Sequence, residues 1–192
     1  LFMGVETLEE PGILVNMEIT VRKIDPQESP QTKSFTRKSL VKSRLTLDIE
    51  NERLVYTVVP VEPPYEREVH IEDTDYGLDE EGPTVFFAEV DGHLAGRIKM
   101  LKWWNQFAYV EDLVVNPEYR GMGIGRTLLE CGIQWAHEKD LPGVMLETQD
   151  DNVPACTLYQ SCGFVLGGFD RNVYRAINPH AKESALYWYL LF

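Results

Sequence analysis

The stretch from Val110 to Leu129 reads VEDLVVNPEYRGMGIGRTLL and contains a strand, a glycine-rich turn and the start of a helix. The residues before the turn are mostly apolar, and Asn116-Pro117 ends the strand because proline cannot donate to a β ladder. After the turn, apolar residues recur at helical spacing, which predicts a long amphipathic helix from Gly121 to about Lys139. The stretch therefore predicts a strand, a tight turn and a helix in direct succession.

The turn, Arg-Gly-Met-Gly-Ile-Gly, predicts a phosphate site at Arg120 to Arg126. Its glycines let backbone N–H groups at the helix start surround an anion, and the helix dipole adds to the attraction. The alternative is that these glycines only permit a sharp corner between strand and helix. Two phosphate-binding classes are excluded, because the run lacks the Lys-Ser/Thr of a P-loop and the G-x-G-x-x-G spacing of a dinucleotide-binding unit.

Length and composition indicate one domain over residues 1–192, with 44% apolar residues to fill its core. We expect residues 1–16 to form a flexible N-terminal extension. No stretch approaches the roughly 20 consecutive apolar residues that span a bilayer, and the first twelve residues lack the basic residues of a signal peptide. These observations predict a cytoplasmic protein without a membrane partner.

The formal net charge of −13 argues against nucleic-acid binding, because phosphate backbones are repelled. Much of the excess lies between Glu62 and Gly82, where many acids accompany one base, Arg67. This run is either a solvated loop or an electrostatic funnel for a cationic ligand. The 3 cysteines lack C-x-x-C spacing, and the 4 histidines are scattered, so we expect reduced thiols and no metal.

Outside the central stretch, hydrophobic patterning predicts a mixed α/β protein. Residues 27–42 are expected to form a short helix or an ordered loop, and Pro60, Pro63 and Pro64 to end a hairpin before an acidic linker. A helix is predicted over Pro154 to Cys162. Predicted strands are Met17 to Ile24, a hairpin from Ser43 to Val61 around Asn51-Glu52, Thr84 to Val90 and His93 to Leu101 around Asp91-Gly92, Phe107 to Val115, Leu141 to Thr148, Phe164 to Phe169, Asn172 to Ile177, and Leu186 to Phe192.

Two separated motifs resemble the Gcn5-related N-acetyltransferase (GNAT) superfamily. Arg120-x-x-Gly123-x-Gly125, after an apolar strand ending in Val-x-Pro, resembles its motif A, and Asn152-x-x-Ala155-x-x-x-Tyr159 resembles its motif B helix. The resemblance spans roughly Thr84 to Phe192. It implies an α/β GNAT fold, in which helices flank a mixed and mostly antiparallel central sheet with splayed central strands.

The same resemblance implies acetyl-CoA as the cosubstrate, with its pyrophosphate at the turn and its pantetheine along the motif B helix. A backbone N–H near Leu113 to Val115 would polarise the thioester carbonyl. The residues implied to bind the cosubstrate are Leu113, Val114, Val115, Arg120, Gly121, Gly123, Ile124, Gly125, Arg126 and Asn152.

Within the superfamily the chain resembles the streptothricin acetyltransferases, in Trp104-Asn105-Gln106, Val110 to Leu113, Leu146 to Asp150 and the tail Ala185 to Trp188. This likeness implies a small cationic amine as substrate, acetylated on the β-lysine moiety of streptothricin, and hence antibiotic resistance. Two alternatives stay open, a protein or peptide N-acetyltransferase acting on basic substrates and a non-catalytic CoA-binding sensor. The sequence leaves the choice between a monomer and a homodimer open.

An ammonium group must lose a proton before its nitrogen attacks a thioester, so the site needs a base or a water path for that proton. It also needs an oxyanion donor and an acid for the departing sulfur. The resemblance makes Tyr159 the acid, against its reading as a core aromatic. Glu147 is the favoured base because an acid inside an apolar strand is costly to bury without a purpose. Glu111 is a second candidate for the base and is expected at the substrate, unless strand alternation points it to solvent. Asp170 and Tyr174 are expected to line the acceptor pocket; the alternatives are a turn acid and a packed aromatic.

Overall fold

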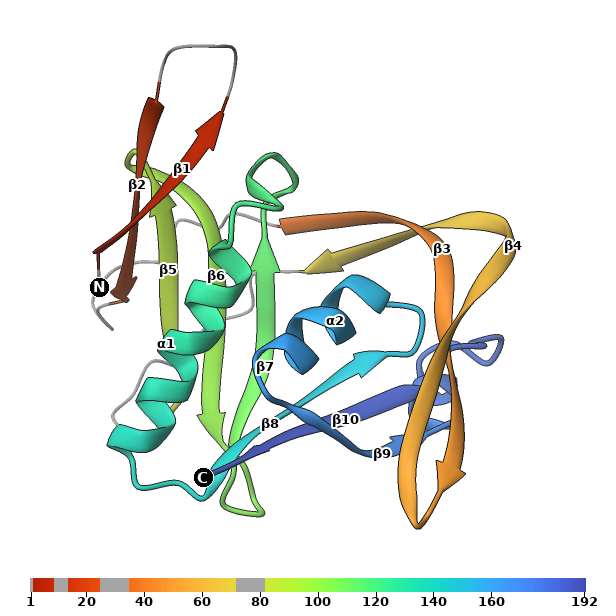
Figure 1. The fold of residues 1–192 in the computed structure, drawn as a ribbon. Coiled ribbons are helices and arrows are strands. Elements are labelled where there is room, and N and C mark those ends of the chain that lie inside the picture. Colours follow the sequence, from red (N-terminus) through yellow and green to blue (C-terminus); the bar gives the residue numbers. More distant parts are fainter. Residues whose placement is uncertain (1, 9–13, 25–34, 72–81) are drawn as a thin grey trace.

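The structure is a computed structural model that describes residues 2–8, 14–24, 35–71 and 82–192 (Figure 1). Within these residues an eight-stranded sheet has the order β1-β2-β5-β6-β7-β8-β10-β9, and β3 and β4 form a separate two-stranded sheet. The elements are β1 (Phe2–Leu8), β2 (Leu14–Lys23), β3 (Phe35–Glu50), β4 (Arg53–Ile71), β5 (Thr84–Val90), β6 (His93–Lys102), β7 (Ala108–Val115), η1 (Pro117–Tyr119), α1 (Ile124–Glu138), β8 (Gly143–Gln149), α2 (Val153–Ser161), β9 (Val165–Asp170), η2 (Val173–Ala176) and β10 (Ala185–Leu191).

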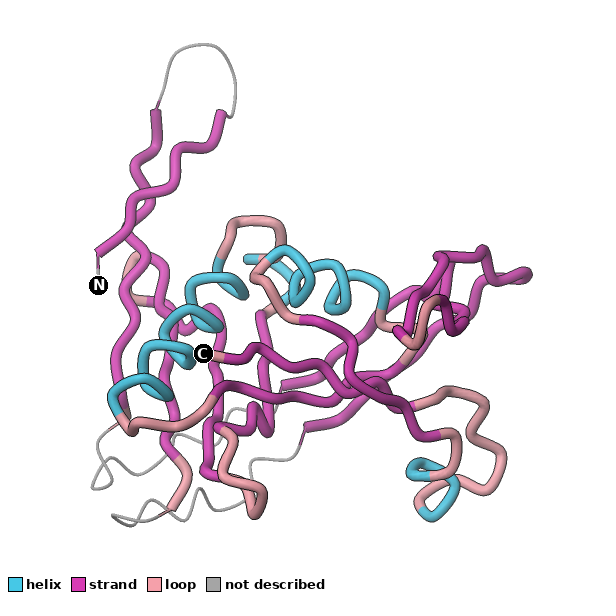
Figure 2. The backbone as a smooth tube through the Cα atoms, turned by 60° about the horizontal axis from the view of Figure 1, so that its bottom comes forward, coloured by secondary structure: helices cyan, strands magenta, loops and turns pink. Residues whose placement is uncertain are grey.

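The predicted fold class is confirmed: the sheet is mixed, with antiparallel neighbours everywhere except between β7 and β8. Figure 2 shows α1 and α2 on the same side of this sheet. None of the described helices has the length and apolar character to cross a bilayer. The three cysteines are free thiols, as expected.

The hairpin of β5 and β6 turns at Asp91-Gly92, as the dipeptide predicts. Both residues have positive φ, 49° and 79°, which is the geometry of the tight turn that matches strand twist. Behind this hairpin α1 buries Ile124, Leu128 and Leu129 in the main hydrophobic core. The core therefore lies between the helices and the middle strands of the sheet.

Three predictions on the secondary structure were wrong. Residues 35–42, expected as a helix or loop, begin β3, while 27–34 lie outside the described residues. Strand β4 continues through the three prolines to Ile71, so half of the expected acidic linker is strand, and 72–81 lie outside the described residues. The stretch Asn172 to Ile177 contains the single turn η2 instead of a strand.

The prolines are tolerated because of where they fall in the β3–β4 ladder. Pro60 pairs with Ser43, and the next pair after a register shift is Tyr65 with Val41. Pro63 and Pro64 thus lie in the irregular segment between two ladder pairs, where no backbone N–H is needed. In the N-terminal part, which we expected as an extension over 1–16, β1 pairs with β2 from residue 2 onward.

The β3–β4 hairpin is fastened to the rest of the molecule by two ion pairs. The Arg44 guanidinium donates to Asp150 at 2.7 Å, and Arg67 pairs with Asp151. The Tyr65 hydroxyl also donates to Asp151, at 2.5 Å. Both aspartates are buried, 6% and 4% exposed, so each carboxylate depends on these donors to offset its lost hydration.

Replacing Arg44 by leucine should lower the free energy of unfolding by about 2–3 kcal/mol, less than for a fully buried pair because Arg44 is partly exposed. Urea denaturation measures this difference. Burial raises the pKa of Asp150 and Arg44 opposes the rise, so in the variant the pKa rises further. A raised pKa in the folded state favours folding at low pH. The difference in free energy of unfolding between wild type and variant should therefore shrink as the pH falls.

The matched control for this prediction is Arg53→Leu. Arg53 is exposed near the tip of the same hairpin and makes no ion pair among the described residues. Its replacement removes the same charge and should change the free energy of unfolding by less than about 0.5 kcal/mol. Equal losses in both variants would show that Arg44 contributes only net charge.

Candidate active site

The glycine-rich turn forms the start of α1. Gly121 and Gly123 have φ of 81° and 84°, a region that glycine enters without steric cost, and Gly123 is the N-cap of α1. The N–H groups of Arg126 and Thr127 donate to the Gly123 oxygen at 2.9 and 3.1 Å. The preceding N–H groups of the turn lie ahead of this helical pattern and, with the helix dipole, suit an anion.

A cavity of about 500 Å³ opens at this turn, between the start of α1, strand β7 and helix α2. All residues predicted to bind acetyl-CoA line it except Val114, which is 3% exposed and buried in the core. Tyr159 lines it as well. Its remaining lining residues are Ser39, Tyr119, Pro154, Ala155 and Leu158. The cavity thus joins an end that suits an anion to apolar walls.

Strands β7 and β8 part next to this cavity. They pair in parallel only over Ala108–Val110 and Val144–Leu146, and the described strands carry no ladder pair beyond these residues. On its other edge β7 remains paired with β6 as far as Val115. The parting therefore leaves the C-terminal half of β7 with one open edge.

The open edge of β7 presents backbone N–H groups. The N–H of Asn116 donates to Ala95 on β6 at 2.8 Å, and successive N–H groups of a strand point to opposite edges. The N–H groups of Val115 and Leu113 therefore point toward the gap. These two residues also line the cavity, whereas the intervening Val114 does not.

Two arginines flank the turn. Arg126 donates to the Ser161 hydroxyl at 2.7 Å, at the end of α2. Arg120 donates from Nε to the Val115 oxygen at 3.3 Å. Both side chains are exposed, so the turn carries positive charge on a protein that is acidic overall.

Helix α2 supplies the opposite wall of the cavity. Asn152 is its N-cap and donates from Nδ2 to Thr148 Oγ1 at 3.1 Å. Tyr159 is 7% exposed and packs against Phe164 and Trp188, with ring centroids 6.1 and 6.4 Å apart. Tyr159 therefore packs in the core, as one interpretation of the sequence expected, and also lines the cavity, as a role at the cosubstrate requires.

Glu147 lies on the other face of the sheet. Its neighbour Leu146 belongs to the core under the helices, and side chains alternate between the faces of a strand. The Tyr174 hydroxyl on η2 donates to Glu147 Oε1. Burial raises the pKa of Glu147, and the hydrogen bond from Tyr174 opposes the rise. The structure thus brings together two of the predicted acceptor-side residues.

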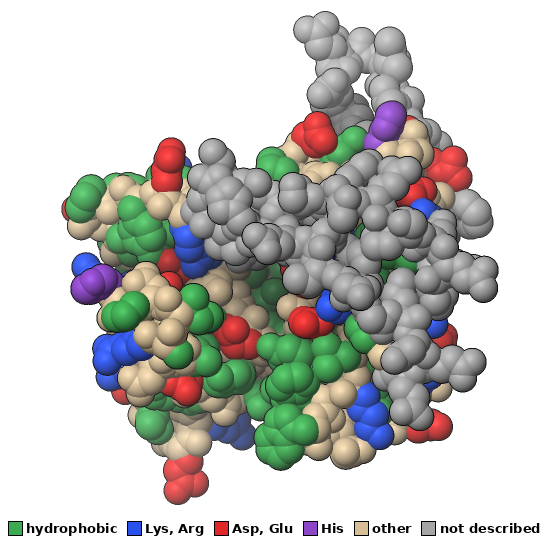
Figure 3. All heavy atoms as spheres, turned by 180° about the vertical axis from the view of Figure 1, so that it is seen from behind, with side chains coloured by type: hydrophobic (Ala, Val, Ile, Leu, Met, Phe, Trp, Pro, Cys, Tyr) green, Lys and Arg blue, Asp and Glu red, His purple; other side chains and the backbone are tan. Residues whose placement is uncertain are grey.

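The other two predicted acceptor-side acids have partners of their own. Glu111 pairs with Lys99, with 2.8 Å between Oε2 and Nζ, and its side chain is 44% exposed. Asp170 Oδ1 accepts the backbone N–H groups of Asn172 and Val173 at 2.6 and 3.2 Å. Asp170 therefore caps the turn that carries Tyr174. Figure 3 views this face of the molecule, where acidic side chains flank a hollow near the middle.

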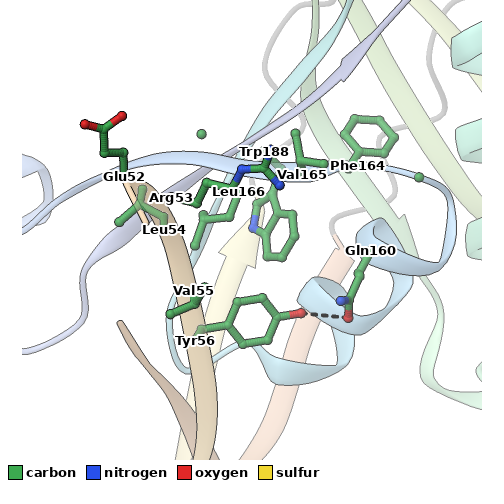
Figure 4. A pocket seen from close by; sticks show the side chains of 12 residues that line it. Glu52, Arg53, Leu54, Val55, Tyr56, Gln160, Phe164, Val165, Leu166 and Trp188 are labelled. Atoms are coloured by element: carbon green, nitrogen blue, oxygen red, sulfur yellow. Dashed lines mark hydrogen bonds between the residues drawn. The ribbon is translucent and has the colours of Figure 1, made fainter. Parts of the chain in front are cut away.

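A second, more open cavity of about 1050 Å³ lies between the β3–β4 hairpin and β9. Figure 4 shows its walls, with the Tyr56 hydroxyl donating to Gln160 at 2.7 Å and the Trp188 indole between the two sides. None of the predicted site residues lines it. The chemistry-bearing residues gather at the first cavity and at the strand gap.

The fold and the site define an enzyme class that holds an anionic cosubstrate at a helix start beside a gap between two strands. The chain belongs to the acetyltransferase (GNAT) family, whose model matches residues 47–164. The GNAT resemblance of the sequence is thereby confirmed.

Two similar proteins point to a particular group within this family. A streptothricin acetyltransferase from Escherichia coli is 37% identical over 157 residues, which cover 75% of this chain and 88% of that protein. Streptothricin acetyltransferase A from Bacillus subtilis (strain 168) is 36% identical over 154 residues, or 80% and 88% of the two chains. The more specific resemblance to streptothricin acetyltransferases is therefore confirmed as well.

Solved structures agree with the sequence relatives. A proposed streptothricin acetyltransferase from Bacillus anthracis str. Ames, in complex with acetyl coenzyme A, has a TM-score of 0.82 and 36% identity, and the match covers 91% of this chain and 99% of that one. A nourseothricin acetyltransferase has a TM-score of 0.73 at 27% identity over 90% and 98% of the two chains.

Sequence reasoning missed Ser39 at the cavity, and it did not place Tyr109 and Tyr187, which lie near Glu147 and outside the cavity. Ser39 lines the cavity and pairs with Arg67 in the β3–β4 hairpin. No sequence pattern around Ser39 predicts that it lies near the glycine-rich turn. Tyr187 pairs with Glu147 in the β8–β10 ladder. The alternation of Tyr187 with buried Leu186 and Trp188 is a signal that could have placed it on the outer face.

Replacing Gly123 by alanine should weaken acetyl-CoA binding at least about tenfold, because the added methyl group enters the approach to the N–H groups. An L-residue at this φ also lowers the free energy of unfolding, by roughly 1–2 kcal/mol. Calorimetry measures the dissociation constant. The added Cβ would meet no protein atom within 4 Å, so the packed core stays intact.

Gly92→Ala is the control, because Gly92 has a φ of 79° and equally open surroundings but lies in the distant β5–β6 turn. It should lower stability by a similar amount and leave acetyl-CoA binding unchanged. An unaltered affinity in folded Gly123→Ala would remove the turn from the cosubstrate site.

Proposed function

We propose that this chain transfers the acetyl group of acetyl-CoA to an amino group of streptothricin, on its β-lysine moiety, and so confers resistance to the antibiotic. As a member of the GNAT family it is an acetyl-CoA-dependent N-acetyltransferase. The observation that carries the proposal is the gap between β7 and β8. It has an anion-binding cavity on one side of the sheet and a half-buried carboxylate, Glu147, on the other.

On the helix side, acetyl-CoA supplies the activated acyl group. The N–H groups from Gly121 to Gly125 and the charges of Arg120 and Arg126 would hold its pyrophosphate. Asn152 and the apolar wall of α2 would guide the pantetheine toward the gap. The N–H groups of Leu113 and Val115 point to the same gap and would stabilise negative charge on the thioester oxygen.

On the other side, Glu147 would accept the proton of the substrate ammonium, whose pKa is roughly 10. The freed nitrogen lone pair then forms the C–N bond while the C–S bond breaks. Tyr159 would give its proton to the leaving sulfur and recover one from the nitrogen through solvent, so the reaction releases one proton overall. Glu111 and Asp170 would surround the cationic acceptor, with Tyr174 bonded to Glu147 at the same pocket.

A thiol-release assay with three acceptor conditions tests the proposal. With acetyl-CoA present, streptothricin should give rapid thiol release, polylysine peptides should give little, and the reaction without acceptor should give almost none. Mass spectrometry of the streptothricin product should show one added acetyl group. Turnover of the peptides alone would favour a protein N-acetyltransferase, and binding of CoA without turnover of any acceptor would favour a sensor.

Tyr159→Phe should keep acetyl-CoA affinity and lower kcat by about 100-fold or more, because general acid assistance to the leaving thiolate is lost while the ring still packs. Pre-steady-state measurement must first show that chemistry limits the rate. Leu158→Met is the control, because it alters a neighbouring cavity residue without removing a proton donor. A near-normal kcat in Tyr159→Phe would leave Tyr159 a packing residue.

A further inference from the structure

The contact between Glu147 and Tyr174 joins two parts of the chain separated by 27 residues. Glu147 lies near the C-terminal end of β8, just beyond the last β7–β8 ladder pair at Leu146. Tyr174 lies on η2, the single turn that follows β9. Figure 2 shows η2 as a small helix at the far end of the loop between β9 and β10. The loop thus delivers one hydroxyl to the strand gap.

The chemistry of the two groups fixes the direction of this contact. The ionised carboxylate of Glu147 can only accept, so the Tyr174 hydroxyl donates. Gln149 lies two residues from Glu147, on the same face of β8. Its amide oxygen is buried and has no hydrogen-bond partner among the described residues.

The other side chains around Glu147 are mainly aromatic or acidic, and Lys99 pairs with one of the acids. Tyr109 from β7 and Tyr187 from β10 flank it, Glu111 lies further along β7 beside Lys99, and Asp170 ends β9. Burial and then the charge of Glu147 raise the pKa of Tyr109 to about 12. Among the described residues, no lysine or arginine forms an ion pair with Glu147. Within the described parts of the chain, the Tyr174 hydroxyl is the group that donates a hydrogen bond to Glu147.

We propose that Tyr174 is a positioning residue, whose hydroxyl holds Glu147 Oε1 so that the other carboxylate oxygen receives the proton of the acceptor ammonium. The inference rests on the proposed function, in which Glu147 is the base. A carboxylate with both oxygens unbonded can rotate about its terminal torsion, which is broad. The bond to Tyr174 removes this freedom and stabilises the charged form that a base requires.

The sign of the expected pH effect follows from the two influences on Glu147. Burial raises its pKa and the hydrogen bond from Tyr174 lowers it. In Tyr174→Phe only the lowering influence is lost, so the pKa of Glu147 rises further. The acid limb of kcat/KM for streptothricin should move to higher pH. On that limb kcat/KM should be about tenfold lower in the variant than in the wild type, and the difference should shrink as the pH rises.

Tyr187→Phe is the matched control. It removes a phenol hydroxyl from the ring opposite Glu147 in the β8–β10 ladder without breaking a hydrogen bond to Glu147, and should leave the acid limb in place. The double variant Glu147→Gln/Tyr174→Phe should be no slower than Glu147→Gln alone, because Tyr174 acts through the carboxylate. Unfolding temperatures of all variants should stay close to that of the wild type.

A carbon-13 NMR titration of the Glu147 carboxyl compares its pKa in the wild type and the two tyrosine variants without requiring enzyme turnover. Its pKa should rise in Tyr174→Phe and stay constant in Tyr187→Phe. An unchanged pKa, or a raised KM with an unmoved acid limb, would overturn the proposal and make Tyr174 a direct substrate contact. Absence of streptothricin turnover in the wild type would instead refute the proposed function, while the titration still decides whether Tyr174 holds Glu147.

Discussion

Strands β7 and β8 run parallel, and this constraint organises the site. Parallel neighbours need a crossover, and α1 provides it, so the start of α1 must lie at the C-terminal end of β7. The ladder of β7 with β8 stops after Val110, so the C-terminal part of β7 has an open edge. The start of α1 with its N–H groups and the open edge of β7 therefore lie side by side. The single crossover from β7 through α1 to β8 is enough to place them there.

The cavity also depends on a hairpin that is distant in sequence. Asp150 and Asp151 follow β8 directly and precede α2, and both are buried. Burying two adjacent carboxylates is unfavourable unless donors replace water, and Arg44 and Arg67 of the hairpin do so. The pairs hold β3 beside α2, which is how Ser39 comes to line the cavity. A structural ion-pair network thus completes a wall of the candidate cosubstrate site.

Features decided by local chemistry could be predicted from the sequence. Asp91-Gly92 and the glycines of the turn need positive φ, and the chain supplies residues that adopt it. Features decided by distant partners could not. The prolines of β4 depend on a register shift against β3, and η2 replaces the expected strand where Asp170 caps the turn. The bond between Glu147 and Tyr174 likewise requires the β9–β10 loop to return to β8, which no local pattern encodes.

The division of the site between the two faces of the sheet has a chemical consequence. A carboxylate close to a phenol raises the phenol's pKa, and burial together with Glu147 does so for Tyr109. The same charge beside Tyr159 would make that phenol a weaker acid toward the leaving sulfur. Tyr159 instead lies among Phe164 and Trp188 on the helix side, while Glu147 lies on the opposite face. The sheet separates the groups, and in the proposed mechanism the gap between β7 and β8 would let them act on one thioester.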